Sequence, residues 1–211
     1  MPGGRRPFNR RRPRRAVGRR VVIVCEGSKT EPGYFNGIRQ SMRLPTAQVY
    51  VVHPNATDPL SIVRAAIDYR RQRVREHAWS TGDSAWAVFD GDEHQHANPH
   101  NWNDAIQTAD SQGINLAVSN PCFELWYLLH YQDQFAQLSR EDAERRISGH
   151  LGEYQKAKVY WPDPLEPLTQ EAIGRARQLA DRLVADGGRR HSNPSTDVFN
   201  LVESLLELQS E

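Results

Sequence analysis

Residues 21–35 read VVIVCEGSKTEPGYF, and the expected fold class starts from them. The first five are apolar and mostly β-branched, as in a strand that is buried on both faces. An acid and a glycine end this strand, and Thr30 is then expected to be the N-cap of a helix with Pro32 in its first turn. The stretch predicts a strand, a turn and a helix, which together begin a βαβ unit.

The same alternation of strands and helices continues to about residue 131. Parallel neighbours in a sheet need a crossover connection, and helices that make it cover both faces. The expected fold class is therefore α/β, with a mostly parallel four-stranded sheet flanked by helices. Strands are expected at 21–26, 48–53, 84–90 and 114–119, helices at 30–42, 58–77, 102–111 and 123–131, and a polar loop at 91–100.

The C-terminal part of the chain shows a different pattern, because we expect no strand beyond residue 132. Helices are expected at about 139–149, 169–186 and 196–209, the last with Ser195 or Thr196 as its N-cap. We therefore expect one domain over 20–211, made of a sheet core at about 20–131 and a helical extension at about 132–209.

The charge is distributed unevenly along the chain. The first twenty residues carry nine arginines and no acid, whereas the remainder has 18 basic and 26 acidic residues. Residues 1–19 cannot bury enough apolar surface to fold alone, so we expect a disordered tail. Two interpretations of this tail stay open: its arginines, including Arg14 and Arg15, neutralise nucleic-acid phosphates, or they form a solubilising leader.

No apolar run approaches the roughly 20 residues needed to cross a bilayer, and the arginine-rich N-terminus lacks the apolar stretch of a secretory signal. We therefore expect a cytoplasmic protein without a membrane span. Cys25 and Cys122 form neither a disulfide framework nor a zinc-binding pattern, and both are expected to be reduced core residues.

Polar residues end three of the predicted strands. Glu26 follows the first, Asp90 ends the third with Asp92 beside it, and Asn120 follows the fourth. Ligand sites in open parallel sheets form at the carboxyl ends of the strands, so these side chains are expected at one edge. Three carboxylates there suit Mg²⁺. The alternative is that each acid is only a helix cap or turn former, as is common after strands.

Four motifs together resemble the RloB family, and the resemblance spans residues 21–205. RloB-like proteins resemble Toprim domains, which are defined by a glutamate after one strand and an Asp-x-Asp after another; here these are Glu26, Asp90 and Asp92. The motifs are VCEGSKTEPGYF at 24–35, VFDGD at 88–92, SNPCFELW at 119–126 and NPSTDV at 193–198.

The resemblance implies a nuclease in which these three acids hold Mg²⁺ or Mn²⁺ and cleave phosphodiester bonds in RNA, possibly tRNA, or in DNA. It also implies a role in anti-phage abortive infection together with a separate ATPase partner. Two alternatives stay open: a non-catalytic subunit that binds nucleic acid or the ATPase, and a phosphatase with Asp90 as nucleophile.

Five further residues are candidates for supporting roles. Lys29 either meets a phosphate or is a solvated turn residue, and Glu31 is either a ligand or a first-turn acid that complements the helix dipole. Glu124 lies in an apolar helix, where it either supports the site with Asn120 or belongs to a capping box. Lys156 and Lys158 resemble a basic segment of the family that approaches nucleic-acid phosphates.

Two local motifs suggest other kinds of site. His94, His96 and His100 form a pattern that can bind zinc or transfer protons, although the segment also has the composition of a loop. Residues 27–30 (GSKT) resemble part of a phosphate-binding loop, but the full pattern G-x-x-x-x-G-K-[ST] is absent, and residues 24 and 25 are Val and Cys. ATP hydrolysis by this chain is therefore not expected.

Overall fold

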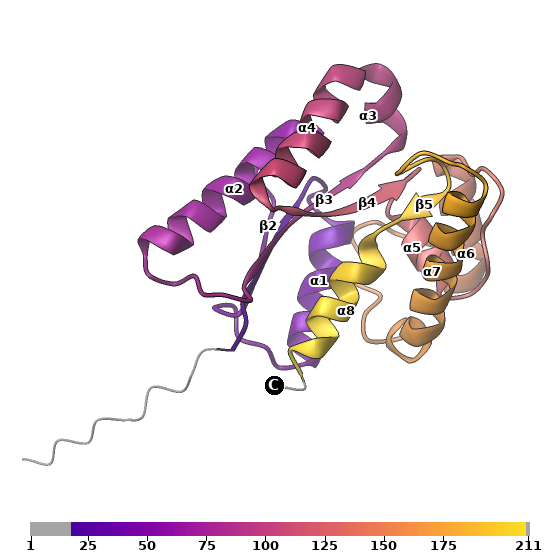
Figure 1. The fold of residues 1–211 in the computed structure, drawn as a ribbon. Coiled ribbons are helices and arrows are strands. Elements are labelled where there is room, and N and C mark those ends of the chain that lie inside the picture. Colours follow the sequence, from indigo (N-terminus) through magenta and orange to yellow (C-terminus); the bar gives the residue numbers. More distant parts are fainter. Residues whose placement is uncertain (1–17, 210–211) are drawn as a thin grey trace, which may run out of the picture.

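The computed structural model describes residues 18–209, except for the side chains of Asp92 and Glu93. Its core is a five-stranded sheet with strand order β2-β1-β3-β4-β5 (Figure 1). The first four strands are parallel and β5 is antiparallel to β4, which confirms the expected mostly parallel α/β fold. The strands are β1 (Val21–Cys25), β2 (Val49–Val52), β3 (Ser84–Asp90), β4 (Asn115–Asn120) and β5 (Ser195–Thr196).

Helices cover both faces of the sheet, so that the structure has three layers (Figure 1). Helices α2 and α4 pack on one face, and α1, α5, α7 and α8 lie on the other. The helices are α1 (Thr30–Ser41), α2 (Pro59–Arg75), α3 (Asp92–Ala97), α4 (Pro99–Gln112), α5 (Glu124–Leu129), α6 (Arg140–Leu151), α7 (Thr169–Ala185), α8 (Val198–Glu207) and the 3₁₀ turn η1 (Glu166–Leu168).

The alternation of side chains along β1 explains its continuous apolar sequence. Val21, Ile23 and Cys25 pack into the core beneath α1 and α5, whereas Val22 and Val24 pack into the core beneath α2 and α4. Successive residues of a strand point to opposite faces, so a strand with helices on both sides needs apolar residues throughout. Cys25 and Cys122 are buried and free, as expected.

An aromatic cluster fixes the start of α1 against α5 and the segment near residue 160. The ring of Tyr34 makes edge-to-face contacts with Phe35 at 5.4 Å and with Phe123, Tyr127 and Trp161 at 5.6 Å each. Such pairs add to the free energy gained by burying the rings. The loop at residues 26–29 is therefore attached to a rigid base.

Helix α3 lies inside the segment 91–100, where the sequence predicted a loop, so that prediction was wrong. The helix is short because Asn98 ends it and also caps α4, accepting a hydrogen bond from Asn101 N at 3.1 Å. Pro99 then occupies the first turn of α4. Two helices thus meet at residue 98, and the composition of that junction gave the whole segment the appearance of a loop.

Strand β5 was also not predicted, since Ser195 and Thr196 were expected to cap the last helix. They instead extend the sheet, and α8 begins at Val198 with Asp197 in the N-cap position. The hydroxyls of Ser119 and Thr196 lie 2.8 Å apart across the new strand pair. After β1, α1 begins at Thr30 itself, so Lys29 rather than Thr30 is the N-cap residue.

No helix within residues 18–209 combines the length and hydropathy of a membrane span.

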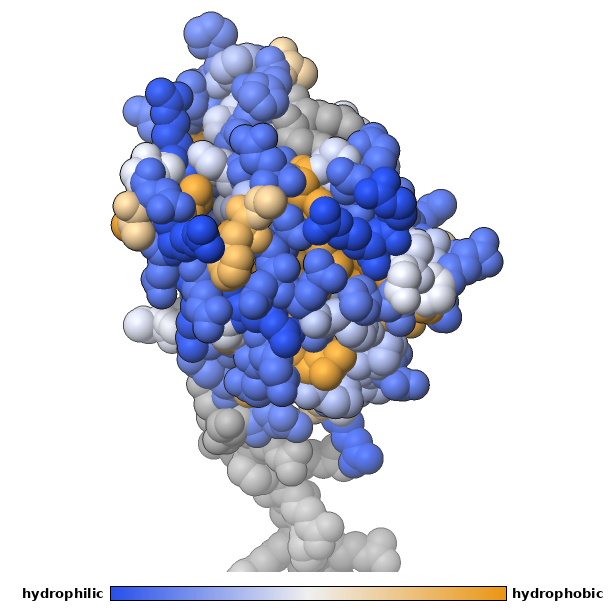
Figure 2. Space-filling model, turned by 90° about the vertical axis from the view of Figure 1, so that its right-hand side faces the viewer, coloured by the Kyte–Doolittle hydropathy of each residue, from blue (hydrophilic) through white to orange (hydrophobic). Residues whose placement is uncertain are grey.

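The face that carries α6 and α7 is mostly hydrophilic, with small and separate hydrophobic areas (Figure 2).

Candidate functional site

The strand order places a topological switch point between β1 and β3. From β1 the chain continues to β2 on one side and later returns to β3 on the other. In open parallel sheets such a point opens a crevice at the carboxyl ends of the two strands. Glu26 directly follows β1, and its backbone N donates to Val88 O at 2.9 Å; Asp90 ends β3. The structure therefore brings these two predicted acids to the same crevice.

Hydrogen bonds hold both carboxylates in place. Glu26 Oε2 accepts from Asp90 N at 3.2 Å, and Glu26 Oε1 lies 2.6 Å from His94 Nε2. Because a carboxylate only accepts, Nε2 is the protonated nitrogen of His94. Asp90 Oδ1 accepts from Phe123 N, and its Oδ2 pairs with Arg140, both at 2.9 Å. Residues from four separate parts of the chain thus meet at two carboxylates.

Two more carboxylates, Glu31 and Glu124, are buried beside this pair. Glu31 packs against Gly27, where an added Cβ would lie only 2.1 Å from Glu31 Oε2, so this close approach requires glycine. Glu124 accepts from Tyr154 at 2.6 Å. Ser119 and Asn120 bond to other residues, so the predicted alternative of a capping box around Glu124 is not formed.

These groups line two adjoining hollows of about 190 and 410 Å³, which we call the acidic crevice. The two hollows share five of their lining residues: Gly27, Glu31, Asp90, Arg140 and Lys156. The smaller one also reaches Lys29 and Glu124, and the larger one reaches Glu26 and His94. Four carboxylates and three basic side chains therefore line the crevice: Glu26, Glu31, Asp90 and Glu124, and Lys29, Arg140 and Lys156.

Burial and mutual repulsion raise the pKa of two of the carboxyls. The pKa of Asp90 lies well above its ordinary value, first because the group is buried and second because Glu31 is near, although Arg140 opposes the shift. Burial also raises the pKa of Glu31; backbone N–H groups oppose this, and the charges of Glu124 and Glu26 add to it. The crevice thus holds more negative charge than its own arginine compensates.

The third predicted acid, Asp92, has a side chain outside the described part of the structure. Among the described side chains, no group of three or more His, Cys, Asp or Glu residues is arranged to hold a metal ion. The three histidines are not brought together: His94 contacts Glu26, whereas His96 and His100 are exposed on α3 and α4.

The predicted basic residues have different positions. Lys29 is exposed at the rim of the crevice. Lys156 Nζ lies 2.7 Å from Glu144, which raises the pKa of the lysine. Lys158 is exposed, and its Nζ stands 5.0 Å from the centre of the Tyr160 ring. The predicted phosphate contacts Arg14 and Arg15 lie outside the described residues.

Asn120 is buried behind the crevice rather than among its carboxylates. Its Nδ2 donates to His191 O at 2.8 Å and to Gln95 Oε1 at 3.3 Å. Gly91 packs against it so closely that an added Cβ would lie 2.9 Å from Asn120 Cβ. Asn120 therefore links the end of β4 to α3 and to the segment before β5.

Sequence reasoning missed two residues that touch the acids, Arg140 and Tyr154. Arg140 lies 50 positions from Asp90 at the start of α6. Only three of the 27 basic residues are lysine, so one more arginine carries no signal in this chain. Tyr154 precedes the noted lysines, but no periodicity connects it to Glu124. Both contacts depend on how α5 and α6 pack.

The fold and the site together define a class of protein. It is an α/β protein with an acidic crevice at the switch point of a mostly parallel sheet, and basic residues flank the crevice. The family model described as RloB-like protein matches residues 21–205, so the chain belongs to the RloB family. The matched range contains every residue of the acidic crevice. No curated protein and no solved structure matches the chain.

Proposed function

We propose that this protein is a divalent-metal-dependent nuclease that hydrolyses phosphodiester bonds in RNA or DNA. The observation that carries the proposal is the meeting of Glu26 and Asp90 at the β1–β3 switch point, with basic side chains around them. A phosphodiester is an anion, and it approaches carboxylates only when positive charge lies between or beside them.

The chemistry of the crevice fits a hard divalent cation. Its donors are carboxylate oxygens, which Mg²⁺ and Mn²⁺ prefer. Burial and the nearby Glu31 raise the pKa of Asp90 despite the presence of Arg140, so a cation bound beside Asp90 would stabilise its ionised form. The proposed ligands are Glu26, Asp90 and Asp92, which lies two residues after the end of β3. A bound cation would supply Lewis-acid stabilisation of the phosphoryl group and easier ionisation of the attacking water.

The other residues have roles that follow from their contacts. His94 orients Glu26 through its 2.6 Å hydrogen bond, and Arg140 orients Asp90. Lys29 and Lys156 border the crevice, where their ammonium groups can hold the substrate phosphate in reach of the acids. Glu31 and Glu124 add negative charge from beneath and so strengthen the attraction for a cation.

The biological setting follows from the family resemblance. RloB-like proteins resemble Toprim nucleases that act in anti-phage abortive infection beside an ATPase partner, and we extend this setting to the present chain. The contacts of Asp90 argue against the alternative of a phosphatase with an aspartate nucleophile, because both of its oxygens already accept hydrogen bonds, one from Phe123 N and one from Arg140.

The proposal is tested by incubating the purified protein with labelled RNA and DNA in the presence of Mg²⁺, Mn²⁺ or EDTA, with and without the partner ATPase. We expect cleavage that needs the metal and that falls at least a hundredfold in Asp90→Asn and in Glu26→Gln. The matched control is Asp181→Asn, which changes an exposed aspartate on α7 and should cleave like the wild type.

A protein that cleaves no nucleic acid under any of these conditions would instead be a non-catalytic binding subunit. Cleavage that persists in both crevice variants would place the chemistry elsewhere or in a contaminant. Either result would overturn the nuclease proposal.

A further inference from the structure

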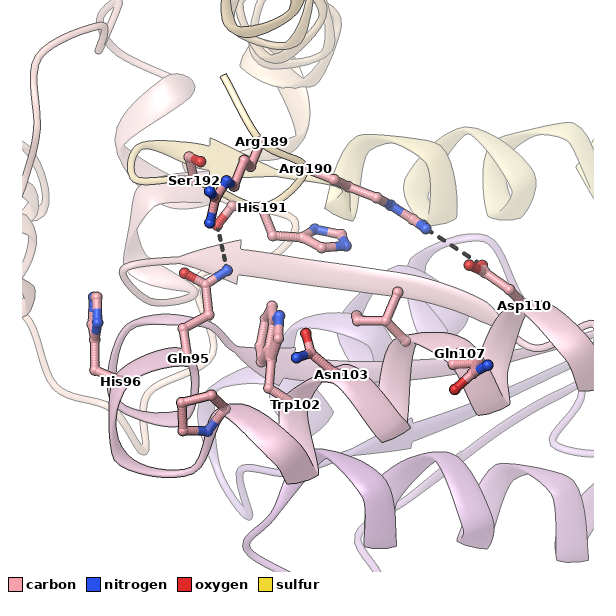
Figure 3. A pocket seen from close by; sticks show the side chains of 12 residues that line it. Gln95, His96, Trp102, Asn103, Gln107, Asp110, Arg189, Arg190, His191 and Ser192 are labelled. Atoms are coloured by element: carbon pink, nitrogen blue, oxygen red, sulfur yellow. Dashed lines mark hydrogen bonds and ion pairs between the residues drawn. The ribbon is translucent and has the colours of Figure 1, made fainter. Parts of the chain in front are cut away.

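A separate hollow of about 690 Å³ lies between α4 and the segment 189–192 that precedes β5. Figure 3 shows Trp102, Asn103 and Gln107 of α4 on one side and Arg189, Arg190 and His191 on the other. Its volume is within the range of small-molecule sites. None of the catalytic roles proposed above uses this hollow, which we call the α4 pocket.

The α4 pocket is polar at its walls and aromatic at its base. Three side-chain amides line it, from Gln95, Asn103 and Gln107, and Trp102 is buried beneath them. An amide offers both donors and acceptors, as the edge of a nucleobase does. Arg189 is exposed at the mouth of the pocket. The lining therefore suits a ligand with a polar planar part and an anionic part.

His191 provides an independent sign of a ligand. It is only 3% exposed, yet its Nε2 has no hydrogen-bond partner among the described residues. Its ring stands edge to face with Trp102 at 5.8 Å and extends from segment 189–192 towards α4 (Figure 3). A buried polar atom without a partner destabilises the fold, and a hydrogen bond from a ligand in the pocket would remove that cost.

The backbone at His191 is also held in an unusual conformation. Its φ of 62° lies in the left-handed region, which non-glycine residues seldom adopt. The structure maintains it through the carbonyl oxygen, which accepts from Asn120 at 2.8 Å and from Gln95 at 3.0 Å. Asn120 ends β4 at the same edge of the sheet where Asp90 ends β3, so these hydrogen bonds attach the α4 pocket to the edge that carries the acidic crevice.

A third hollow, of about 550 Å³, shares the lining residue Arg140 with the acidic crevice and the lining residue His96 with the α4 pocket. It is also lined by Glu141. The three hollows therefore neighbour one another, and Lys156, Arg140 and Arg189 supply basic groups to them. Basic groups spaced along neighbouring hollows suit a flexible polyanion.

We propose that the α4 pocket binds one unpaired nucleotide of the same strand whose phosphodiester enters the acidic crevice. Arg189 pairs with the phosphate, and the amides of Asn103 and Gln107 bond to the edge of the base. A base within a duplex is already paired and stacked, so the pocket selects single-stranded or looped segments. This inference rests on the proposed function for its ligand, and it is tested by binding alone.

The test measures fluorescence anisotropy of a labelled single-stranded oligonucleotide, as RNA and as DNA, in EDTA so that no cleavage occurs. Arg189→Ala should weaken binding of the single strand roughly tenfold, because one charge-assisted contact is lost. It should also make the dependence of affinity on salt shallower by about one phosphate contact. The matched control is Arg71→Ala, an exposed arginine near the far end of α2, which should bind like the wild type.

A second variant, Asn103→Trp, fills the pocket from an exposed position of α4 and leaves all charges in place. It should weaken single-strand binding with an unchanged salt dependence. If both pocket variants bind as the wild type does, the proposal is overturned. Calorimetry also measures the binding of free mononucleotides. The proposal is overturned as well if these variants bind free mononucleotides more weakly but bind the oligonucleotide as the wild type does.

The binding assay separates this inference from the nuclease proposal. A protein that binds the strand through Arg189 but never cleaves would refute the nuclease alone. A protein that cleaves normally in both pocket variants and binds as the wild type does would refute the α4 pocket alone.

Discussion

Glu31 is a buried carboxylate that lies near other carboxylates. It is 6% exposed, and the charges of Glu124 and Glu26 add to the effect of burial in raising its pKa. The folded protein therefore binds this proton more tightly than the unfolded chain does. The stabilising contribution of Glu31 is complete at pH values below the unfolded pKa and is lost as the pH rises through the folded pKa.

Glu31→Gln should accordingly raise the free energy of unfolding in EDTA at pH 8, because the amide carries no charge into the crevice. The gain should shrink as the pH is lowered towards the ordinary pKa of glutamate. Mg²⁺ should in turn raise the free energy of unfolding of the wild type more than that of Glu31→Gln. The rise for the wild type should reach about 2.7 kcal/mol when the Mg²⁺ concentration is a hundred times the Kd of the wild type for Mg²⁺. Urea unfolding with and without Mg²⁺ measures both effects.

Glu171→Gln is the control for this experiment, since Glu171 is an exposed first-turn acid of α7. It should change neither the stability in EDTA nor the response to Mg²⁺. A Glu31→Gln protein that is less stable than wild type in EDTA at pH 8 would contradict the assigned electrostatics.

At the scale of elements, α5 is buried on all sides and ends on an unusual C-cap. His130 is 1% exposed, its Nδ1 lies 2.9 Å from Trp126 O, and burial lowers its pKa to about 4. Arg175, which donates to the carbonyl oxygens of Leu129 and His130, also disfavours a charged imidazole. The end of α5 is thus stable only while His130 is neutral.

The pKa of His130 is lower in the folded protein, at about 4, than the value of about 6.5 in the unfolded chain. The stability that neutral His130 contributes is therefore complete above pH 6.5 and is lost as the pH falls to about 4. Between pH 7.5 and 5.0 the free energy of unfolding of the wild type should fall by roughly 2 kcal/mol more than that of His130→Leu. Urea titrations at the two pH values give this difference. Other titrating groups cancel in the comparison.

His100→Leu changes an exposed histidine and should show the same pH dependence as the wild type. Equal pH slopes for the wild type and His130→Leu would show that His130 is not held neutral.

At the scale of the whole molecule, the charges of the tail and the body differ in sign. Residues 1–17 contain seven arginines, and the body that follows has an excess of acid. The body itself begins at residues 18–20, because Arg19 pairs with Glu207 at 2.9 Å and Arg20 donates to Ala78 O at 2.6 Å. A deletion that tests the tail alone should therefore stop at residue 17.

Deletion of residues 1–17 should weaken nucleic-acid binding and flatten its salt dependence. Each lost phosphate contact makes the slope of log affinity against log salt less negative by about 0.7–0.9. Anisotropy titrations at several salt concentrations measure the slope. A full-length variant with the seven arginines changed to glutamine should match the deletion, and an unchanged slope in both would leave the tail as a solubilising leader.

Several features of this protein were determined by its sequence alone. Continuous apolar runs such as 21–25 identify strands buried on both faces, because alternate side chains of one strand enter different cores. The parallel sheet follows from the alternation of such runs with helices. The positions of Glu26 and Asp90 at one edge follow in turn, since residues that end parallel strands share an edge.

Other features were decided only by the tertiary structure. Ser195 and Thr196 form a strand only because they pair with the free edge of β4. Asn120, the partner of Ser195, lies 75 residues earlier in the chain. Arg140 meets Asp90, and His191 meets Asn120, through packing that joins distant segments. Local periodicity carries no information about such pairs. The strand ends of the candidate site were therefore predictable, whereas its basic partners and the α4 pocket depend on contacts that exist only once the chain has folded.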